Sequence, residues 1–219
     1  AKTISPSSNS IPSNKLISLF APVTSTESTE SSNRNCTIEQ RPSASPLKKS
    51  YLINSFSNYL RLDINNFLLA ADEVAKRGYW VFRMGKKVEK KLNTSNPKII
   101  DYANSDLRSD FMDIYLGANC SFCISSSTGL DQISYVFRKP IAHIISPISI
   151  MFSFSNKFVS LFKHHINKKD NTKLSLSEIF KSGCAFFHYN NEFINKGIEL
   201  KDNSPEEIRD FAIEVLERY

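Results

Sequence analysis

Apolar residues along the chain fall into two patterns, which predict buried strands with helices between them. After Asp63, a suitable N-cap, apolar residues from Ile64 to Ala75 recur at helical spacing, and Gly78 follows where a helix cap is expected. Residues 79–84 form an apolar run typical of a strand buried on both faces, and residues 98–102, 122–124 and 140–145 are expected to form further short strands. Because helices and strands alternate, we predict an α/β fold with a Rossmann-like parallel sheet and helices on both faces.

The remaining pattern predicts further helices and one edge strand. Capping-box sequences begin at Ser175 and Ser204, and the helix after Ser204 carries an apolar stripe that would dock it on the domain. Residues 197–200 are expected to form an edge strand, and residues 164–169 an exposed basic loop; residues 146–173 otherwise show no clear period. A helix is predicted over residues 109–117. The side chains of Phe111, Ile114 and Tyr115, and that of Ala118 just after this range, are expected to face the core.

The first 50 residues differ in composition from the rest. They are rich in Ser, Thr, Asn and Pro, and their apolar residues lie mainly in the run 16–21, which is compatible with a short strand. A segment of this composition buries too little apolar surface to offset its chain entropy. We therefore expect a low-complexity, largely disordered segment over residues 1–50 and a Rossmann-like domain over residues 51–219.

Charge and hydropathy narrow the choice of partners. The net charge of +6 favours an anionic partner such as a nucleotide or an anionic lipid, but the lysines are scattered and no nucleic-acid-reading motif is present, so nucleic acid is not an expected partner. The start of the chain shows no secretory leader, and no apolar run is long enough to span a membrane. A cytoplasmic location is expected.

Four cysteines provide one CxxC sequence, Cys120 to Cys123, together with Cys36 and Cys184. A zinc site needs more ligands at suitable spacing, and redox CxxC pairs usually begin a helix, whereas Cys123 lies in a predicted strand. We expect these thiols to be buried as small apolar groups, and no metal site is predicted.

A turn of small hydroxyl residues, Ser126, Ser127, Thr128 and Gly129, connects the strand over residues 122–124 to a following helix. At such a turn, free N–H groups and the helix dipole attract an anion, and small side chains let it approach the backbone. The hypothesis is a phosphate pocket. The alternative is an ordinary helix cap that binds nothing.

Further candidate ligand-binding residues lie at the ends of other predicted elements. Arg83 ends an apolar strand, where its guanidinium must meet either a ligand or a buried carboxylate, and Gly85 lets the backbone turn or a ligand come close. Asp110 and Asp113 lie near a predicted helix start, where the dipole alone can explain a carboxylate. Because parallel strands end at one edge, Arg83 and the turn at Ser126 are expected to share one anion pocket.

Four motifs in combination resemble the carboxyl-terminal half of a bacterial glycosyltransferase family of GT-B type found among surface-polysaccharide genes. They are RGYWVFRMG at 77–85, SDFMDIYLG at 109–117, SSTGL at 126–130 with Pro140 downstream, and GIELKDNSPEEI at 197–208. The resemblance covers about residues 59–219. The placement of Asp113 ahead of a strand and a Ser/Thr turn is also similar to the donor-binding half of fucosyltransferases.

The resemblance implies a domain that holds a nucleotide sugar and transfers the sugar to a glycan or lipid-linked acceptor in polysaccharide synthesis. Arg83 and the hydrogen-bond donors of the Ser/Thr turn would neutralise the negative charge that develops on the leaving nucleoside diphosphate, so neither a metal nor another cofactor is implied. The general base usually comes from the other GT-B domain, so no catalytic residue is assigned here. The implied donor-binding residues are Arg83, Gly85, Asp113, Ser126, Ser127, Thr128 and Gly129.

A complete GT-B enzyme carries a second Rossmann-like domain before this half, and the residues ahead of Asp63 do not resemble one. The chain is therefore expected to be one half of an enzyme, or a truncated one. Two alternatives stay open: a non-catalytic nucleotide-binding or interaction module, and a nucleotide-sugar epimerase-like enzyme. Peripheral contact with the inner membrane is a further option for a lipid-linked acceptor.

Overall fold

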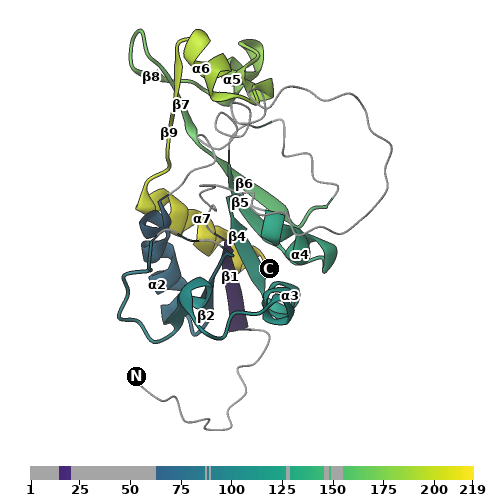
Figure 1. The fold of residues 1–219 in the computed structure, drawn as a ribbon. Helices are drawn as coiled ribbons and strands as arrows, with labels where there is room; N and C mark the ends of the chain where they lie inside the picture. The colour runs from purple at the N-terminus through teal and green to yellow at the C-terminus, as the bar shows by residue number, and fades with distance from the viewer. Residues whose placement is uncertain are drawn as a thin grey trace, which may run out of the picture.

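The computed structural model describes residues 15–20, 63–86, 88, 90–126, 129–145, 148 and 155–219. Its centre is a six-stranded parallel sheet in the order β3-β2-β1-β4-β5-β6 (Figure 1). The strands are β1 (Leu16–Phe20), β2 (Trp80–Met84), β3 (Ile99–Ile100), β4 (Phe122–Ser125), β5 (Ile141–Ile145) and β6 (Phe158–Phe162). The predicted Rossmann-like α/β fold is confirmed, and the strand order reverses between β1 and β4.

Strand β1 lies at the centre of this sheet, between β2 and β4. Its residues pair in parallel register with both neighbours, and Ile17 and Leu19 are 0% and 2% exposed. The division expected at residue 50 leaves this strand outside the domain, whereas the sheet contains it. A five-residue strand with four apolar residues is sufficient in this polar segment, because both neighbouring strands supply hydrogen bonds. The disorder expected for the rest of residues 1–50 lies outside the described residues.

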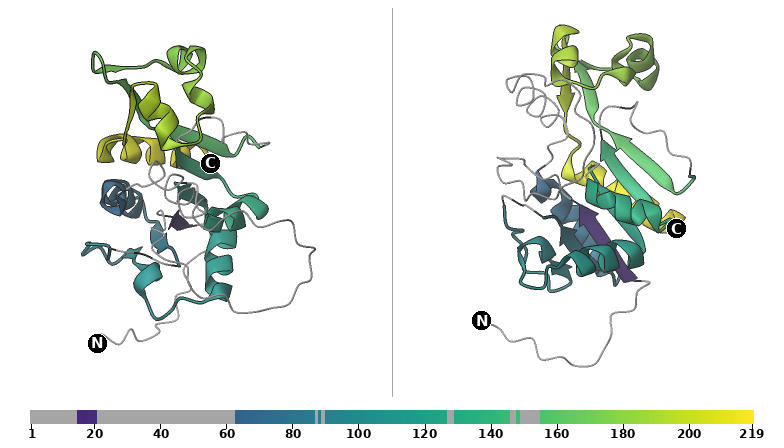
Figure 2. Two further views of the ribbon diagram at one scale, coloured as in Figure 1. Left: turned by 45° about the horizontal axis from the view of Figure 1, so that its top comes forward. Right: turned by 45° about the vertical axis from the view of Figure 1, so that its right-hand side comes forward.

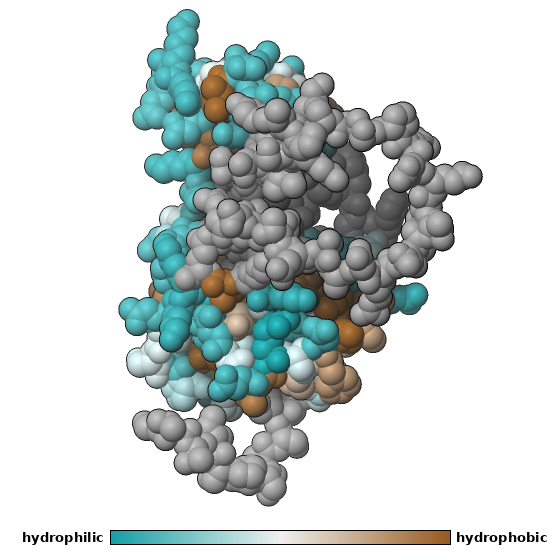
Figure 3. Space-filling view, in the orientation of Figure 1, coloured by the Kyte–Doolittle hydropathy of each residue, from teal (hydrophilic) through white to brown (hydrophobic). Residues whose placement is uncertain are grey.

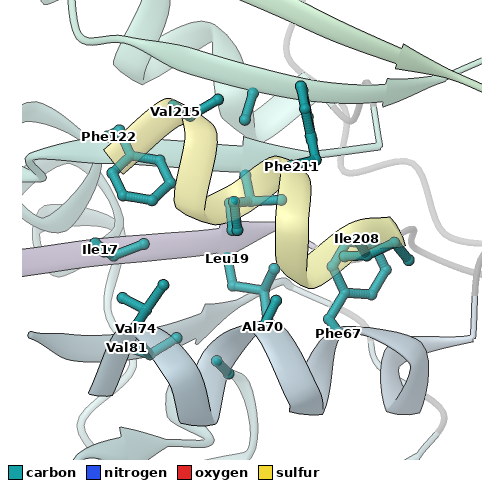
Figure 4. Close-up of a cluster of buried hydrophobic side chains, with 14 of the residues drawn as sticks. Ile17, Leu19, Phe67, Ala70, Val74, Val81, Phe122, Ile208, Phe211 and Val215 are labelled. Carbon is teal, nitrogen blue, oxygen red and sulfur yellow. The ribbon is translucent and has the colours of Figure 1, made fainter. Parts of the chain in front are cut away.

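Two pairs of helices cover the sheet. Helix α2 (Leu68–Lys76), which continues the 3-10 turn η2 (Ile64–Phe67), packs with α7 (Pro205–Arg218) on one face (Figures 1 and 2). Figure 4 shows side chains of α7 meeting those of β1 and α2 in the largest apolar cluster. Helices α3 (Asp110–Asn119) and α4 (Gln132–Val136) lie on the other face. Asp63 accepts a hydrogen bond from the Asn65 N–H, as its role of N-cap predicts.

The expected core face of α3 is wrong. Phe111, Ile114 and Tyr115 are 71%, 49% and 46% exposed, whereas the buried side of the helix holds Leu116 and Gly117. Ala118 is half-buried. Gly117 packs so closely on α4 that a Cβ there would lie 2.9 Å from Cγ2 of Ile133. The helix therefore turns the side that carries Gly117 inward, because the small residue lets α4 approach.

A smaller antiparallel sheet, in the order β8-β7-β9, follows β6. It consists of β7 (His164–Asn167), β8 (Thr172–Lys173) and β9 (Ile198–Lys201), and α5 (Leu176–Lys181) and α6 (Asn190–Asn195) complete this part. The edge strand and both capping boxes are confirmed. The exposed loop expected over residues 164–169 is wrong, because the alternation in β7 turns His165 inward against the ring of Phe193.

Three thiols, Cys120, Cys123 and Cys184, are free and buried, as expected. Burial raises the pKa of Cys120 and of Cys123, so both are neutral thiols at pH 7. Within the described ranges, no three His, Cys, Asp or Glu side chains gather in a way that could hold a metal ion. In the same ranges, no helix combines the length and the apolar character needed to cross a membrane.

Candidate functional site

The carboxyl edge of the sheet next to the β1/β4 reversal is where ligands bind in open α/β folds. Three buried polar side chains lie at this edge: Ser125 at the end of β4, Asp131 just before α4, and His143 in β5. Ser125 and His143 are partners in the β4/β5 register. Because paired residues of neighbouring strands point to the same face, both side chains lie on the α3/α4 side of the sheet.

Hydrogen bonds tie this cluster together. The Ser125 hydroxyl donates to Oδ2 of Asp131 at 2.5 Å, and Nε2 of Gln132 donates to Oδ1 at 3.1 Å. The His143 ring stacks on Phe158, with ring centroids 5.8 Å apart. Sequence reasoning missed Asp131 and His143. The available signal was a polar residue inside the apolar run 141–145 and an acid shortly after the Ser/Thr turn.

Two buried atoms at this edge have no hydrogen-bond partner among the residues that the structure describes. They are the hydroxyl of Ser126, whose residue is 1% exposed, and Nδ1 of His143, whose residue is 8% exposed. A buried polar atom without a partner costs about 1–3 kcal/mol. Such atoms at a ligand-binding edge indicate a place where a ligand oxygen or hydroxyl could complete the hydrogen bonding.

His143 is held in its neutral form at pH 7. Burial, the larger effect, lowers its pKa, while the negative charge of Asp131 raises it, and the net pKa lies below the usual value of 6.5. A neutral imidazole has one donor and one acceptor nitrogen, so His143 can meet either kind of ligand group.

We expect acid to destabilise the protein partly through His143. Its folded pKa is depressed, so the unfolded chain binds the proton more readily, and the free energy of unfolding falls as pH drops below about 6.5. Urea unfolding at pH 7.5, 6.5 and 5.5 should show a smaller loss for His143→Gln than for the wild type. The exposed His188 provides the control, since His188→Gln should follow the wild type. Parallel curves for His143→Gln and the wild type would contradict this expectation.

Arg83 does not join this cluster. Its Nη1 lies 3.0 Å from Oδ1 of Asp101 and donates to the Lys90 carbonyl at 2.7 Å, and the side chain is 3% exposed. Of the two roles that the sequence left open for Arg83, the structure shows the buried ion pair. Arg83 is level with Ile124 two strands away, about 10 Å at the usual strand spacing, and strand alternation directs it to the opposite face from Ser125.

The other predicted donor-binding residues differ in their surroundings. Asp113 is buried and forms an ion pair with Arg108 at 2.9 Å, which accounts for its charge within the fold. Gly85 is packed so that a Cβ would meet Cγ1 of Val88 at 2.8 Å. Gly129 is exposed, and a Cβ there would meet nothing within 4 Å, so space lies in front of the turn. Ser127 and Thr128 lie outside the described residues.

The site is thus a buried Ser125–Asp131–His143 cluster together with the buried Ser126 and the exposed Gly129, which lie on either side of residues 127 and 128 in the sequence. It offers hydroxyl and imidazole groups to a ligand, with space in front of the glycine. Comparison of the chain with models of protein families, with curated proteins and with solved structures finds no match.

Proposed function

We propose that this chain is the donor-binding half of a cytoplasmic GT-B-type glycosyltransferase that transfers a sugar from a nucleotide sugar to a glycan or lipid-linked acceptor. The observation that carries the proposal is the buried hydroxyl of Ser126 at the strand-order reversal, which has no hydrogen-bond partner among the described residues, three positions before the exposed Gly129. A reversal of this kind forms the crevice in which nucleotides bind in doubly wound folds.

The proposed donor contacts are centred on the turn. The Ser126 hydroxyl would donate to a phosphate oxygen, and the small Gly129 would let the diphosphate reach the backbone. A bound diphosphate would also favour the imidazolium form of His143, because a nearby negative charge raises a histidine pKa. Donation from these groups would stabilise the departing nucleoside diphosphate without a metal.

The negative charge of Asp131 must be compensated if a diphosphate is to bind at this site. Asp131 is buried close to the turn and would repel a diphosphate if its charge were unopposed. The Ser125 hydroxyl and Gln132 amide both donate to this carboxylate, which reduces its effect on a ligand. Asp131 would then act as a positioning residue that fixes Ser125 beneath the turn.

A glycine substitution tests the donor site directly. UDP, GDP, ADP and CMP, with their sugar conjugates, would be screened by thermal shift and followed by calorimetry. We expect one nucleoside diphosphate to stabilise the wild type. Gly129→Leu should weaken its binding at least tenfold, because the new side chain fills the open space before the turn. Gly129→Ala is the matched control and should change binding much less.

Two different outcomes of this experiment would contradict the proposed donor site. If no nucleotide stabilises the folded wild type, the chain has no donor site of its own. If a nucleotide binds equally well to Gly129→Leu and the wild type, the donor site lies elsewhere. Circular dichroism and urea unfolding of both glycine variants would establish that the fold is intact.

A non-catalytic nucleotide-binding module is the second candidate. The observation that favours it is the engagement of Arg83 with Asp101, because a transferase benefits from a cation that meets the leaving diphosphate. Nucleotide-sugar binding without release of nucleoside diphosphate, in the presence of glycan and lipid-linked acceptors, would support the module. Release that depends on acceptor would support the transferase.

A further inference from the structure

The outer side of α3 carries apolar side chains that continue onto the end of α4. We call this surface the α3/α4 face, and its members are each 46–71% exposed. Figure 3 shows apolar atoms, coloured brown and tan, gathered at the lower right, where Figure 1 places these helices. The residues of the face are Leu107, Phe111, Ile114, Tyr115, Val136 and Phe137.

The size of this face is at the upper end of the largest apolar patches on monomeric proteins, about 300–600 Å². Covering an aromatic side chain fully buries about 150–250 Å², so six large side chains at these exposures leave roughly 600 Å² open. A standard protein interface buries about 800 Å² on each partner, somewhat more than half of it apolar. The α3/α4 face therefore provides the apolar centre of one standard interface.

The face is also held in place by the packing beneath it. Gly117 of α3 lets Ile133 of α4 approach closely, and the Ser134 hydroxyl donates to the Gly117 carbonyl at 3.0 Å. On the surface, the rings of Phe111 and Tyr115 stack with centroids 6.1 Å apart. A rigid surface loses little conformational entropy when a partner covers it.

Charges at the two ends of the face differ in sign. Both helices run from the carboxyl edge to the amino edge of the sheet, because each connects two parallel strands. Asp106 and the 92% exposed Asp110 lie at the end where α3 begins, and Arg108 at that end is 3.9 Å from Asp110 and 2.9 Å from Asp113, so three carboxylates outnumber one cation there. Arg138 and Lys139 follow the end of α4. Among the described residues, Arg138 and Lys139 form no ion pair with a carboxylate.

We propose that a second copy of this chain covers the α3/α4 face and forms a two-fold symmetric dimer. A two-fold axis across the face pairs the same surface of both copies in opposite directions, which brings the acidic end of one copy to the basic end of the other. An anionic membrane would attract the basic end but would be repelled by Asp106 and Asp110 at the other. The charge pattern therefore fits a copy of the chain better than a lipid surface.

Sedimentation velocity of the whole chain from about 1 to 100 µM tests this dimer. Phe111→Asp and Val136→Asp should each raise the dimer dissociation constant at least tenfold, because each places a charge in the apolar centre of the interface. The matched control is Leu176→Asp, which adds the same charge at a 52% exposed leucine outside the face and should leave the constant unchanged. All three positions are exposed, so urea unfolding should show equal stability.

Charge reversal tests the two-fold arrangement itself. Asp110→Lys and Arg138→Glu should each weaken the dimer, and the double variant should restore most of the affinity, because the reversed charges again meet opposite signs. A wild-type chain that stays monomeric at 100 µM would overturn the proposal. Sedimentation of such a monomer with phosphatidylglycerol vesicles, lost in Phe111→Asp, would assign the face to a membrane instead. Dimers that respond to Leu176→Asp, or charge reversals without rescue, would also refute the arrangement.

Discussion

A chain shortened to residues 51–219 is expected not to fold, although it retains every predicted helix and all but one strand. The shortened chain lacks β1, which hydrogen-bonds to both β2 and β4. Without β1 the sheet is split into two parts. The side chains of α2 and α7 that pack on Ile17 and Leu19 in the largest apolar cluster then lose these contacts. Circular dichroism and urea unfolding of the shortened and whole chains provide the measurement.

A point substitution separates the loss of the strand from other effects of shortening the chain. Leu19→Ala should lower the free energy of unfolding by about 2–5 kcal/mol, because Leu19 is fully packed at the centre of the sheet. The matched control is Ile100→Ala in the edge strand β3, where the side chain is only partly buried and the loss should be smaller. A cooperative urea transition in the shortened chain would show that β1 is dispensable.

Asp101→Ala should lower the free energy of unfolding by about 3–5 kcal/mol, because it leaves the buried Arg83 without its carboxylate. The Leu92 N–H and the Asn104 amide would also lose their acceptor. Replacing both charged partners, in Arg83→Met with Asp101→Leu, should cost less than Asp101→Ala alone, because no buried charge is then left unpaired. Urea unfolding measures all of these variants.

The exposed Asp106 serves as control, since the free energy of unfolding of Asp106→Ala should stay within about 0.5 kcal/mol of the wild-type value.

Acid should reproduce part of the loss of stability expected for Asp101→Ala. Burial raises the pKa of Asp101, but hydrogen bonds from Leu92, Asn104 and Arg83 together lower it below 3.8. This contribution to stability is therefore complete above about pH 4 and is lost as pH falls through the folded pKa. A loss of less than 1 kcal/mol in Asp101→Ala would mean that water replaces the ion pair.

The sheet and its caps were predictable because each depends on local pattern. The runs at β2, β4 and β5 are mostly apolar, as is typical of strands covered on both faces, and Ser175 and Ser204 have the spacing that a capping box requires. Strand β1 was visible only as a short apolar run. Its central place depends on pairing with residues more than 60 positions away, which no local pattern reveals.

The site was only partly predictable, because burial and pairing decide which polar residues remain free for a ligand. The turn at Ser126 and Gly129 was found, but Arg83 has the same apolar surroundings in sequence whether it meets Asp101 or a phosphate. On α3 the apolar residues form a regular stripe, yet that stripe faces outward, since close packing on α4 requires Gly117. Helical periodicity identifies a stripe and does not say whether the core or a partner covers it.

The central place of β1 also affects how the chain can fold during synthesis. Phe20 pairs with Ser125, about 100 residues later, so the ribosome needs roughly 5–20 s at 5–20 residues per second to deliver the second neighbour of β1. Both hydrogen-bonding edges of the strand Leu16–Phe20 are unsatisfied until β2 has been synthesised, and one edge stays unsatisfied until β4 follows. Such a segment is a natural binding site for chaperones that act on nascent chains and a point at which misassembly can begin.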